Sequence, residues 1–391
     1  MQGAVCSRVW SEAQFAERVT HLAEAGDGHG LVDLLRESHF CYAERGSAAI
    51  VRMRGWALLA FRKTGLPEDG LPFVLEELDA GVDPYLVATA ARALRCYPVP
   101  ATDFPPFVLR ALTTMAGRDE PVSFAAFGDY AVAEGGTSPL CELIETLAWL
   151  GPGARSILPT AIELAARPGA FSGPILARFR QAVRAIDAQG SAECCALPNA
   201  IRQSIAWVKR NTPATNGVAF EDHNGEPIRF SEFFAGKPSI VVFFYTRCDN
   251  PLKCSLTISK LGRIQKLLDE RGLTSRIRTA AITYDPSFDL PNRMRDYGLR
   301  RGLRLAQDHR MLRSPGGIDA LRQHFALGVS FLGSVVARHR IEVYVLRADG
   351  QIAYSFERFQ WDEDDVVKHA IETLQPPALS SVPFLGSAAS L

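Results

Sequence analysis

The chain has 391 residues, and its 43 Lys and Arg residues balance 43 Asp and Glu residues. This length favours two domains over one, and a hydrophobic content of 47% is enough for ordinary buried cores. Balanced charge provides no overall field that would attract nucleic acid or an anionic membrane surface. We therefore expect a protein of two globular domains that does not bind nucleic acid.

The first residues lack the charged segment and apolar run of a secretory signal. The sequence also contains no apolar run of roughly 18 residues, the length that a membrane span needs. These features predict a cytoplasmic protein without a membrane span. In that compartment, most of the eight cysteines are expected to be reduced and buried.

Residues 1–212 are predicted to form an all-helical domain in which short breakers separate the helices. Apolar residues recur at helical spacing over residues 11–25, and Ser11 is a suitable N-cap for that helix. A second helix over residues 51–61 is expected to be interrupted at Gly55. Further helices are expected over residues 71–78, 89–94, 105–112, 141–150, 157–166 and 171–186.

Two of these segments repeat each other. Residues 71–78 and 105–112 share Pro-Phe-Val-Leu, and Phe73 and Phe107 lie 34 positions apart. Helix pairs with such a period are typical of alpha-solenoids, here a short HEAT-like array, and the prolines fall at helix starts where a missing N–H costs little. Such an array would bind a client protein along one face. The alternative is an irregular helical bundle that only stabilises its neighbour.

Residues 213–376 are predicted to form a second, α/β domain, after a polar junction over residues 211–217. Strands and helices alternate, and a hairpin and a helix close the pattern, as in a thioredoxin-like fold. Residues 377–391 are expected to form a disordered tail. The expected strands are 240–244, 278–283, 341–346 and 352–356, with a hairpin at Asn224-Gly225 and helices over 257–271, 291–299, 318–326 and 362–374.

The stretch VVFFYTRCDNPLKC, residues 241–254, contains the strongest chemical signal. Its apolar run predicts a buried strand, and Cys248 and Cys254 follow where a helix begins. The partial positive charge at the start of a helix stabilises a thiolate over a thiol. Thiolates attack disulfides and bind soft metals, so the sequence predicts redox or metal chemistry at this cysteine pair.

Residues 215–376 resemble the Sco/SenC family, thioredoxin-fold proteins that bind copper and assist the assembly of cytochrome oxidase. The order and spacing of several short motifs carry the resemblance, and the first half of the chain lies outside it. The motifs are Phe220-x-Asp222-x-x-Gly225, Gly236-Lys237-Pro238, Phe244-Tyr245-Thr246-x-Cys248, Ile282-Thr283-Tyr284-Asp285-Pro286-x-x-Asp289, His339 followed by Tyr344, and Asp349-Gly350.

The resemblance implies that Cys248, Cys254 and His339 are ligands of copper, as Cu(I) or Cu(II). Two thiolates and an imidazole suit this metal. It also implies supporting roles near the site for Asp285 and Asp289. For Asp289, the alternative is a cap on the helix that follows it.

The chain departs from the family in two respects. Five residues separate the two cysteines, whereas the family usually has three. Family members are usually exported or anchored at a membrane, and neither a signal nor an anchor is visible in this sequence.

Three hypotheses for the function therefore stay open. The first is copper binding or delivery at Cys248, Cys254 and His339. The second is a metal-independent thiol–disulfide oxidoreductase, in which one of Cys248 and Cys254 attacks, the other resolves, and His339 tunes the thiol pKa. The third is a non-catalytic adaptor for a cytoplasmic biosynthetic enzyme, whose helical domain binds the client.

Overall fold

The computed structural model describes residues 10–101, 103–128, 136–189 and 217–374. We call the described residues up to 189 the helical region and those from 217 onward the α/β region. The predicted domain boundary at 212, the tail over 377–391 and the junction over 211–216 lie outside the described residues. The domain limits therefore stay a prediction.

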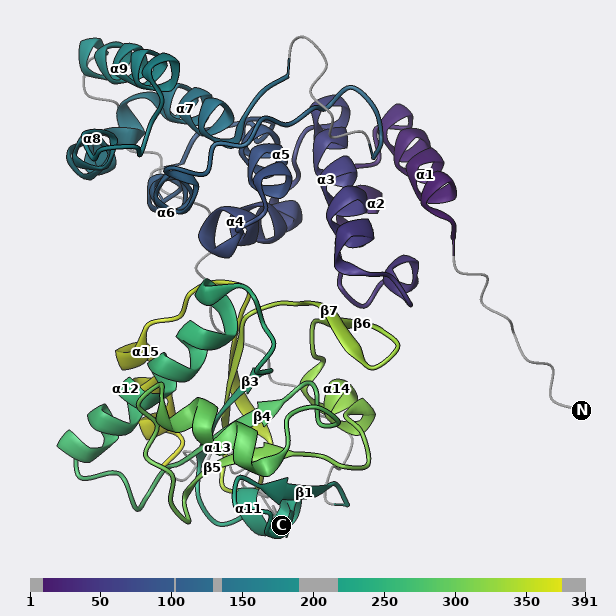
Figure 1. Ribbon diagram of the computed structural model, residues 1–391, viewed down its shortest axis with the longest axis vertical. Helices are drawn as coiled ribbons and strands as arrows, with labels where there is room; N and C mark the ends of the chain where they lie inside the picture. The colour runs from purple at the N-terminus through teal and green to yellow at the C-terminus, as the bar shows by residue number, and fades with distance from the viewer. Residues whose placement is uncertain (1–9, 102, 129–135, 190–216, 375–391) are drawn as a thin grey trace, which may run out of the picture.

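The helices of the helical region lie in two rows (Figure 1). In the first row, each helix contacts the next along the chain. This row contains α1 (Glu12–Glu24), α3 (Ser47–Thr64), α5 (Pro84–Leu94), α7 (Pro139–Leu150) and α9 (Gly173–Ala188). The second row contains α4 (Leu71–Ala80), α6 (Pro105–Met115) and α8 (Leu158–Ala165), also in contact in chain order. The short helix α2 (Gly28–Asp33) packs on α1 and α3, and the 3₁₀ turns are η1 (Phe40–Tyr42), η2 (Glu68–Gly70) and η3 (Gly151–Ile157).

The predicted interruption at Gly55 is wrong, because α3 runs without a break through that position. Gly55 is buried within α3, and a Cβ atom there would collide with the ring of Tyr85 in α5. The glycine therefore permits close packing between two neighbouring helices and does not break the helix. At the start of α1, Ser11 accepts the N–H of Gln14 and forms the expected cap.

The α/β region contains a seven-stranded sheet in the order β2-β1-β5-β4-β3-β8-β9. Strands β3, β4 and β5 run parallel, and the other neighbours pair antiparallel. The strands are β1 (Ala219–Asp222), β2 (Pro227–Arg229), β3 (Ser239–Phe244), β4 (Arg278–Thr283), β5 (His309–Arg313), β8 (Glu342–Leu346) and β9 (Ile352–Glu357). The helices are α11 (Phe230–Phe234), α12 (Leu256–Glu270), α13 (Pro291–Leu299), α14 (Asp319–Phe325) and α15 (Glu363–Glu372).

Strand β3 lies inside the sheet, between β4 and β8, and every one of its residues is buried. Ile240, Val242 and Phe244 point to one face of the sheet and pack against α12 and α15. Phe243 points to the opposite face and packs against Phe325 of α14. Continuous apolar sequence in β3 is therefore explained by cover on both faces. The β3–α12–β4 unit, followed by the antiparallel pair β8–β9 and α15, forms a thioredoxin-like α/β fold, as predicted.

A second, two-stranded sheet was not predicted. It consists of β6 (Val329–Leu332) and β7 (Val335–His339), which pair antiparallel with Val329 opposite His339. The hairpin lies against the helical region, where Ser47 donates a hydrogen bond to the carbonyl oxygen of Ala337 at 2.8 Å. His339 is therefore the last residue of β7. Strand β5 was also missed.

The two regions meet through α4, the helix nearest to the α/β region in Figure 1, and through α3, which contacts β7. The side-chain amide of Asn250 donates to the carbonyl oxygen of Ala80, at the end of α4, at 2.7 Å. Within the described ranges, no helix has both the length and the apolar character to cross a membrane.

Candidate functional site

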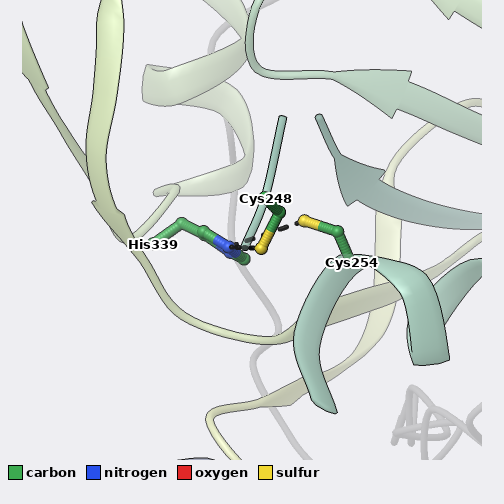
Figure 2. A group of neighbouring side chains, drawn as sticks. All are labelled: Cys248, Cys254 and His339. Carbon is green, nitrogen blue, oxygen red and sulfur yellow. Dashed lines mark hydrogen bonds between the residues drawn. The ribbon is translucent and has the colours of Figure 1, made fainter. Parts of the chain in front are cut away.

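Two cysteines and one histidine come together at the edge of the α/β region that faces α4. The Sγ atoms of Cys248 and Cys254 lie 3.4 Å and 3.5 Å from Nε2 of His339. One potential ligand atom from each residue lies within 4.8 Å of the other two (Figure 2). Both cysteines are free thiols in this structure. The arrangement offers two sulfur donors and one imidazole nitrogen at a single point.

The loop after β3 folds back so that the two sulfurs meet despite the five residues between them. Residues Pro251–Ser255 form a π-helical turn in which the N–H of Lys253 donates to the carbonyl oxygen of Asn250 at 3.1 Å. The side chain of Asn250 also accepts the N–H of Leu252 at 2.9 Å. The regular helix α12 begins only after this turn, so Cys254 lies just before the helix and does not open it.

The orientation of His339 leaves Nε2 available to the sulfurs. Its Nδ1 lies 2.9 Å from the carbonyl oxygen of Arg340. A carbonyl can only accept a hydrogen bond, so Nδ1 carries a proton, and in the neutral imidazole Nε2 then presents a lone pair. The rings of Tyr245 and Tyr284 pack around the imidazole, with centroid separations of 5.4 Å for both. This fixed tautomer is the form in which a histidine binds a metal.

The two thiols differ in acidity because they interact with each other. A hydrogen bond from the Cys254 thiol lowers the pKa of Cys248, against the cost of burial, and His339 lowers it further through a hydrogen bond and its charge when the imidazole ring is protonated. Burial raises the pKa of Cys254, and the neighbouring Cys248 raises it further. The pair therefore favours one thiolate, at Cys248, bound to one thiol. The sequence attributed thiolate stabilisation to the helix start, but the cysteine nearest α12 has the raised pKa.

Asp285 and Asp289 support the segment that carries Cys248. The carboxylate of Asp289 accepts the N–H of Thr246 at 3.1 Å and the hydroxyl of Thr283 at 2.5 Å. Asp285 accepts from Nε of Arg247 at 3.1 Å. The N-cap position of α13 is occupied by Leu290, and no side chain forms a hydrogen bond with the backbone there. The alternative role of Asp289 as a helix cap is therefore wrong.

A buried ionic cluster next to the site was not predicted from the sequence. It brings together three glutamates of the helical region and four cations from both regions, joined by ion pairs. The members are Glu37, Glu76, Glu77, Arg54, Lys253, Arg338 and Arg358. The available signal was the pair of adjacent glutamates inside the otherwise apolar segment LPFVLEELDA of α4. Buried charges in such a helix require partners.

Access to the site leads through a cavity of about 390 Å³ between the two regions. Cys248 and His339 line one wall, and Ala48 and Val51 of α3 line the other. Cys248 is half-buried, whereas Cys254 is 1% exposed and His339 5% exposed. A ligand that enters this cavity therefore meets Cys248 first.

The comparison with known families agrees with the position of this site. The model of the SCO1/SenC family matches residues 210–375. No curated protein sequence matches the chain.

Solved structures of Sco proteins are similar to part of the chain. A SCO1/SenC family lipoprotein from Bacillus anthracis is 16% identical, with a TM-score of 0.36, over 40% of this chain and 92% of that protein. Arabidopsis thaliana ScoI with copper bound is 18% identical, with a TM-score of 0.34, over 41% and 98%. Yeast Sco1 with copper bound is 21% identical, with a TM-score of 0.34, over 42% and 92%.

Proposed function

We propose that this protein binds copper at Cys248, Cys254 and His339 and delivers it to a client. The observation that carries the proposal is the convergence of two sulfurs and Nε2 from separate segments within 4.8 Å. Thiolate and imidazole donors are those that Cu(I) prefers, and a soft three-donor site suits it. The family match over residues 210–375 supports the same chemistry. Bound copper would supply a soft metal ion that can change its charge by one electron. The ion could be transferred to thiolate or imidazole ligands of a client.

The residues around the three donors have definite tasks in this proposal. The Cys248 thiolate, the more accessible donor, would be the first to meet an incoming ion or acceptor. The carbonyl of Arg340 holds the proton of His339 on Nδ1, and Asp289 fixes the strand end that leads to Cys248. Tyr245 and Tyr284 exclude water from the imidazole.

We further propose that the helical region is a HEAT-like array that binds the client. Its two rows of helices, each in contact in chain order, are the arrangement that such repeats adopt. Because α4 borders the cavity that leads to Cys248, a client bound along this row would lie next to the donors and would act at a raised effective concentration. The domain limits and the cytoplasmic location enter this proposal as predictions from the sequence.

A thiol–disulfide oxidoreductase is the second candidate, favoured by the lowered pKa of Cys248. In that reaction the Cys248 thiolate attacks a client disulfide, forms a mixed disulfide and releases one client thiolate, which takes a proton. Cys254 then loses its proton and attacks Cys248, which releases the second client thiol. The client is reduced by two electrons, and Cys248 and Cys254 end as a disulfide.

Anaerobic titration with Cu(I) against a competing chelator tests the first proposal. We expect tight binding of one ion per chain, weakened in Cys248→Ser, Cys254→Ser and His339→Ala. Cys141→Ser is the matched control, because Cys141 is a half-buried free thiol in α7, outside the site. Equal affinity in all five proteins would reject a copper site at these residues.

The metal-free protein tests the second candidate. A reversible two-electron couple that disappears in Cys248→Ser and in Cys254→Ser would support it. If iodoacetamide labels neither cysteine at neutral pH in the metal-free protein, the oxidoreductase reaction is excluded.

A further inference from the structure

We propose that Glu76 of α4 is a positioning residue for the site, so that the helical region sets the placement of Cys254 and His339. The inference rests on the proposed function of these residues as copper ligands. It assigns the helical region a second role, beyond binding a client, because one of its side chains holds the chain neighbours of two donors.

The first link joins the segments of the two buried donors to each other. Lys253 directly precedes Cys254, and its Nζ donates to the carbonyl oxygen of His339 at 2.7 Å. Lys253 is only 8% exposed. A displacement of this ammonium group would therefore move the turn that carries Cys254 relative to the end of β7.

The second link joins both segments to α4. Oε1 of Glu76 lies 3.4 Å from Nζ of Lys253 and 3.4 Å from Nη2 of Arg338, which directly precedes His339. Oε2 of Glu76 pairs with Arg358 at 2.6 Å. One carboxylate of the helical region thus contacts the neighbours of two donors, and Glu76 itself is 1% exposed.

The burial of the cluster makes these contacts sensitive to the loss of one charge. In the whole cluster, four cations face three carboxylates, and none of the seven side chains is more than 12% exposed. Removing one partner from such a group leaves a buried charge uncompensated. Lys253 and Arg338 would then move toward water, and the segments of Cys254 and His339 would move with them.

An independent contact holds the loop between the cysteines against the same helix. Asn250 donates to the carbonyl oxygen of Ala80 at the end of α4. Helix α4 therefore touches the ligand loop both at Asn250 and at Lys253, so the geometry of the site depends on the position of this helix.

The test compares Glu76→Gln with Glu37→Gln in the full chain. Both substitutions remove one buried carboxylate that pairs with Arg358. Glu37 forms its other ion pair with Arg54, whereas Glu76 pairs with Lys253 and Arg338. We expect Glu76→Gln to weaken Cu(I) binding by about 10- to 100-fold, the usual effect of losing an outer contact of a metal site. Glu37→Gln should lower the unfolding midpoint comparably with little change in affinity.

A second readout requires no metal. Diamide takes two electrons and two protons from Cys248 and Cys254, which form a disulfide while diamide becomes the hydrazine. We expect this oxidation to be several-fold slower in Glu76→Gln and unchanged in Glu37→Gln. Absence of Cu(I) binding in the unsubstituted protein would reject the proposed copper function, whereas the diamide rates would still test positioning.

Two outcomes would overturn the inference: unchanged affinity and rate in Glu76→Gln, or equal losses in both variants. If Glu76→Gln does not fold, Lys253→Gln breaks the same ion pair from the other side. Its control is Lys266→Gln, at an exposed position of α12. The same losses are then expected for Lys253→Gln only, and their absence would overturn the inference equally.

Discussion

The ammonium group of Lys253 donates a hydrogen bond to the carbonyl oxygen of His339 at 2.7 Å, with both residues almost fully buried. A lysine is rarely buried unless it is paired, and here Glu76 of α4 provides the opposite charge. The contact joins the cysteine loop, the histidine strand and the helical region at one point. The stability of the interface and the geometry of the donors therefore depend on the same charges.

The ionic cluster predicts how stability changes with pH. Burial by itself would raise the pKa of Glu76, but Lys253, Arg358 and Arg338 outweigh it and lower the pKa to about 2, from an ordinary value of 4.5. The stabilisation by this carboxylate is thus complete above 4.5 and is lost as the pH falls toward 2. Glu76→Gln does not titrate, so its deficit in free energy of unfolding should stay constant between neutral pH and about pH 5 and shrink below 4.5.

Urea unfolding of both proteins over this pH range measures that deficit. A deficit that already disappears near neutral pH would contradict the assignment of a strongly lowered pKa to Glu76.

The cavity between the regions predicts that access to Cys248 depends on the size of the reagent. Ala48 is exposed at the start of α3 and lines the cavity. A tryptophan at this position should slow the labelling of Cys248 by fluorescein maleimide several-fold and leave labelling by methyl methanethiosulfonate nearly unchanged. Mass spectrometry of the labelled peptide measures both rates.

Ala166→Trp, at an exposed position far along the helical region, is the control and should change neither rate. Equal slowing of both reagents by Ala48→Trp would indicate a distorted site and not a blocked entrance.

Asp289 is expected to contribute to both stability and metal affinity. In Asp289→Ala, the hydroxyl of Thr283 and the N–H of Thr246 lose a charged acceptor in a buried place. We expect a loss of about 2–3 kcal/mol in the free energy of unfolding, with weaker Cu(I) binding because Thr246 lies two residues before Cys248. Asp319→Ala, whose carboxylate is 90% exposed, should stay within about 0.5 kcal/mol of the unsubstituted protein. Similar losses in the two variants would argue against this role.

The close packing of α3 on α5 makes Gly55 intolerant of a side chain. The methyl group in Gly55→Ala would meet the ring of Tyr85, so we expect a loss of about 1–3 kcal/mol, as for other overpacked cores. Alanine is favoured over glycine in a helix by about 1 kcal/mol. We expect the stability lost through overpacking to exceed this gain. Urea unfolding provides the measurement, with Gly153→Ala, in open space, as a control. A stabilised Gly55→Ala variant would show that the two helices can separate at little cost.

The sequence predicted the α/β architecture because its signals are local. Continuous apolar residues indicate β3. Asp349-Gly350 indicates the turn between β8 and β9, and Asn224-Gly225 indicates the turn between β1 and β2. Strands β5 and β7 were missed because basic residues interrupt their apolar pattern, and β6 was missed because its four residues include a serine and no turn signal such as Asn-Gly or Asp-Gly follows them. His339 was selected through the order of the motifs and not through the strand that presents it.

The sequence by itself thus determined the two classes of structure, the cysteine pair and the histidine as candidates for one site. Tertiary structure decided that the three donors meet across a five-residue loop, that Asp289 holds a strand end, and that α4 borders the site. The ion pairs Glu76–Lys253 and Glu37–Arg358 join residues 177 and 321 positions apart. Contacts at such separations leave no periodic pattern in either segment, because each charge resembles a solvated residue until the partner that buries it is in place.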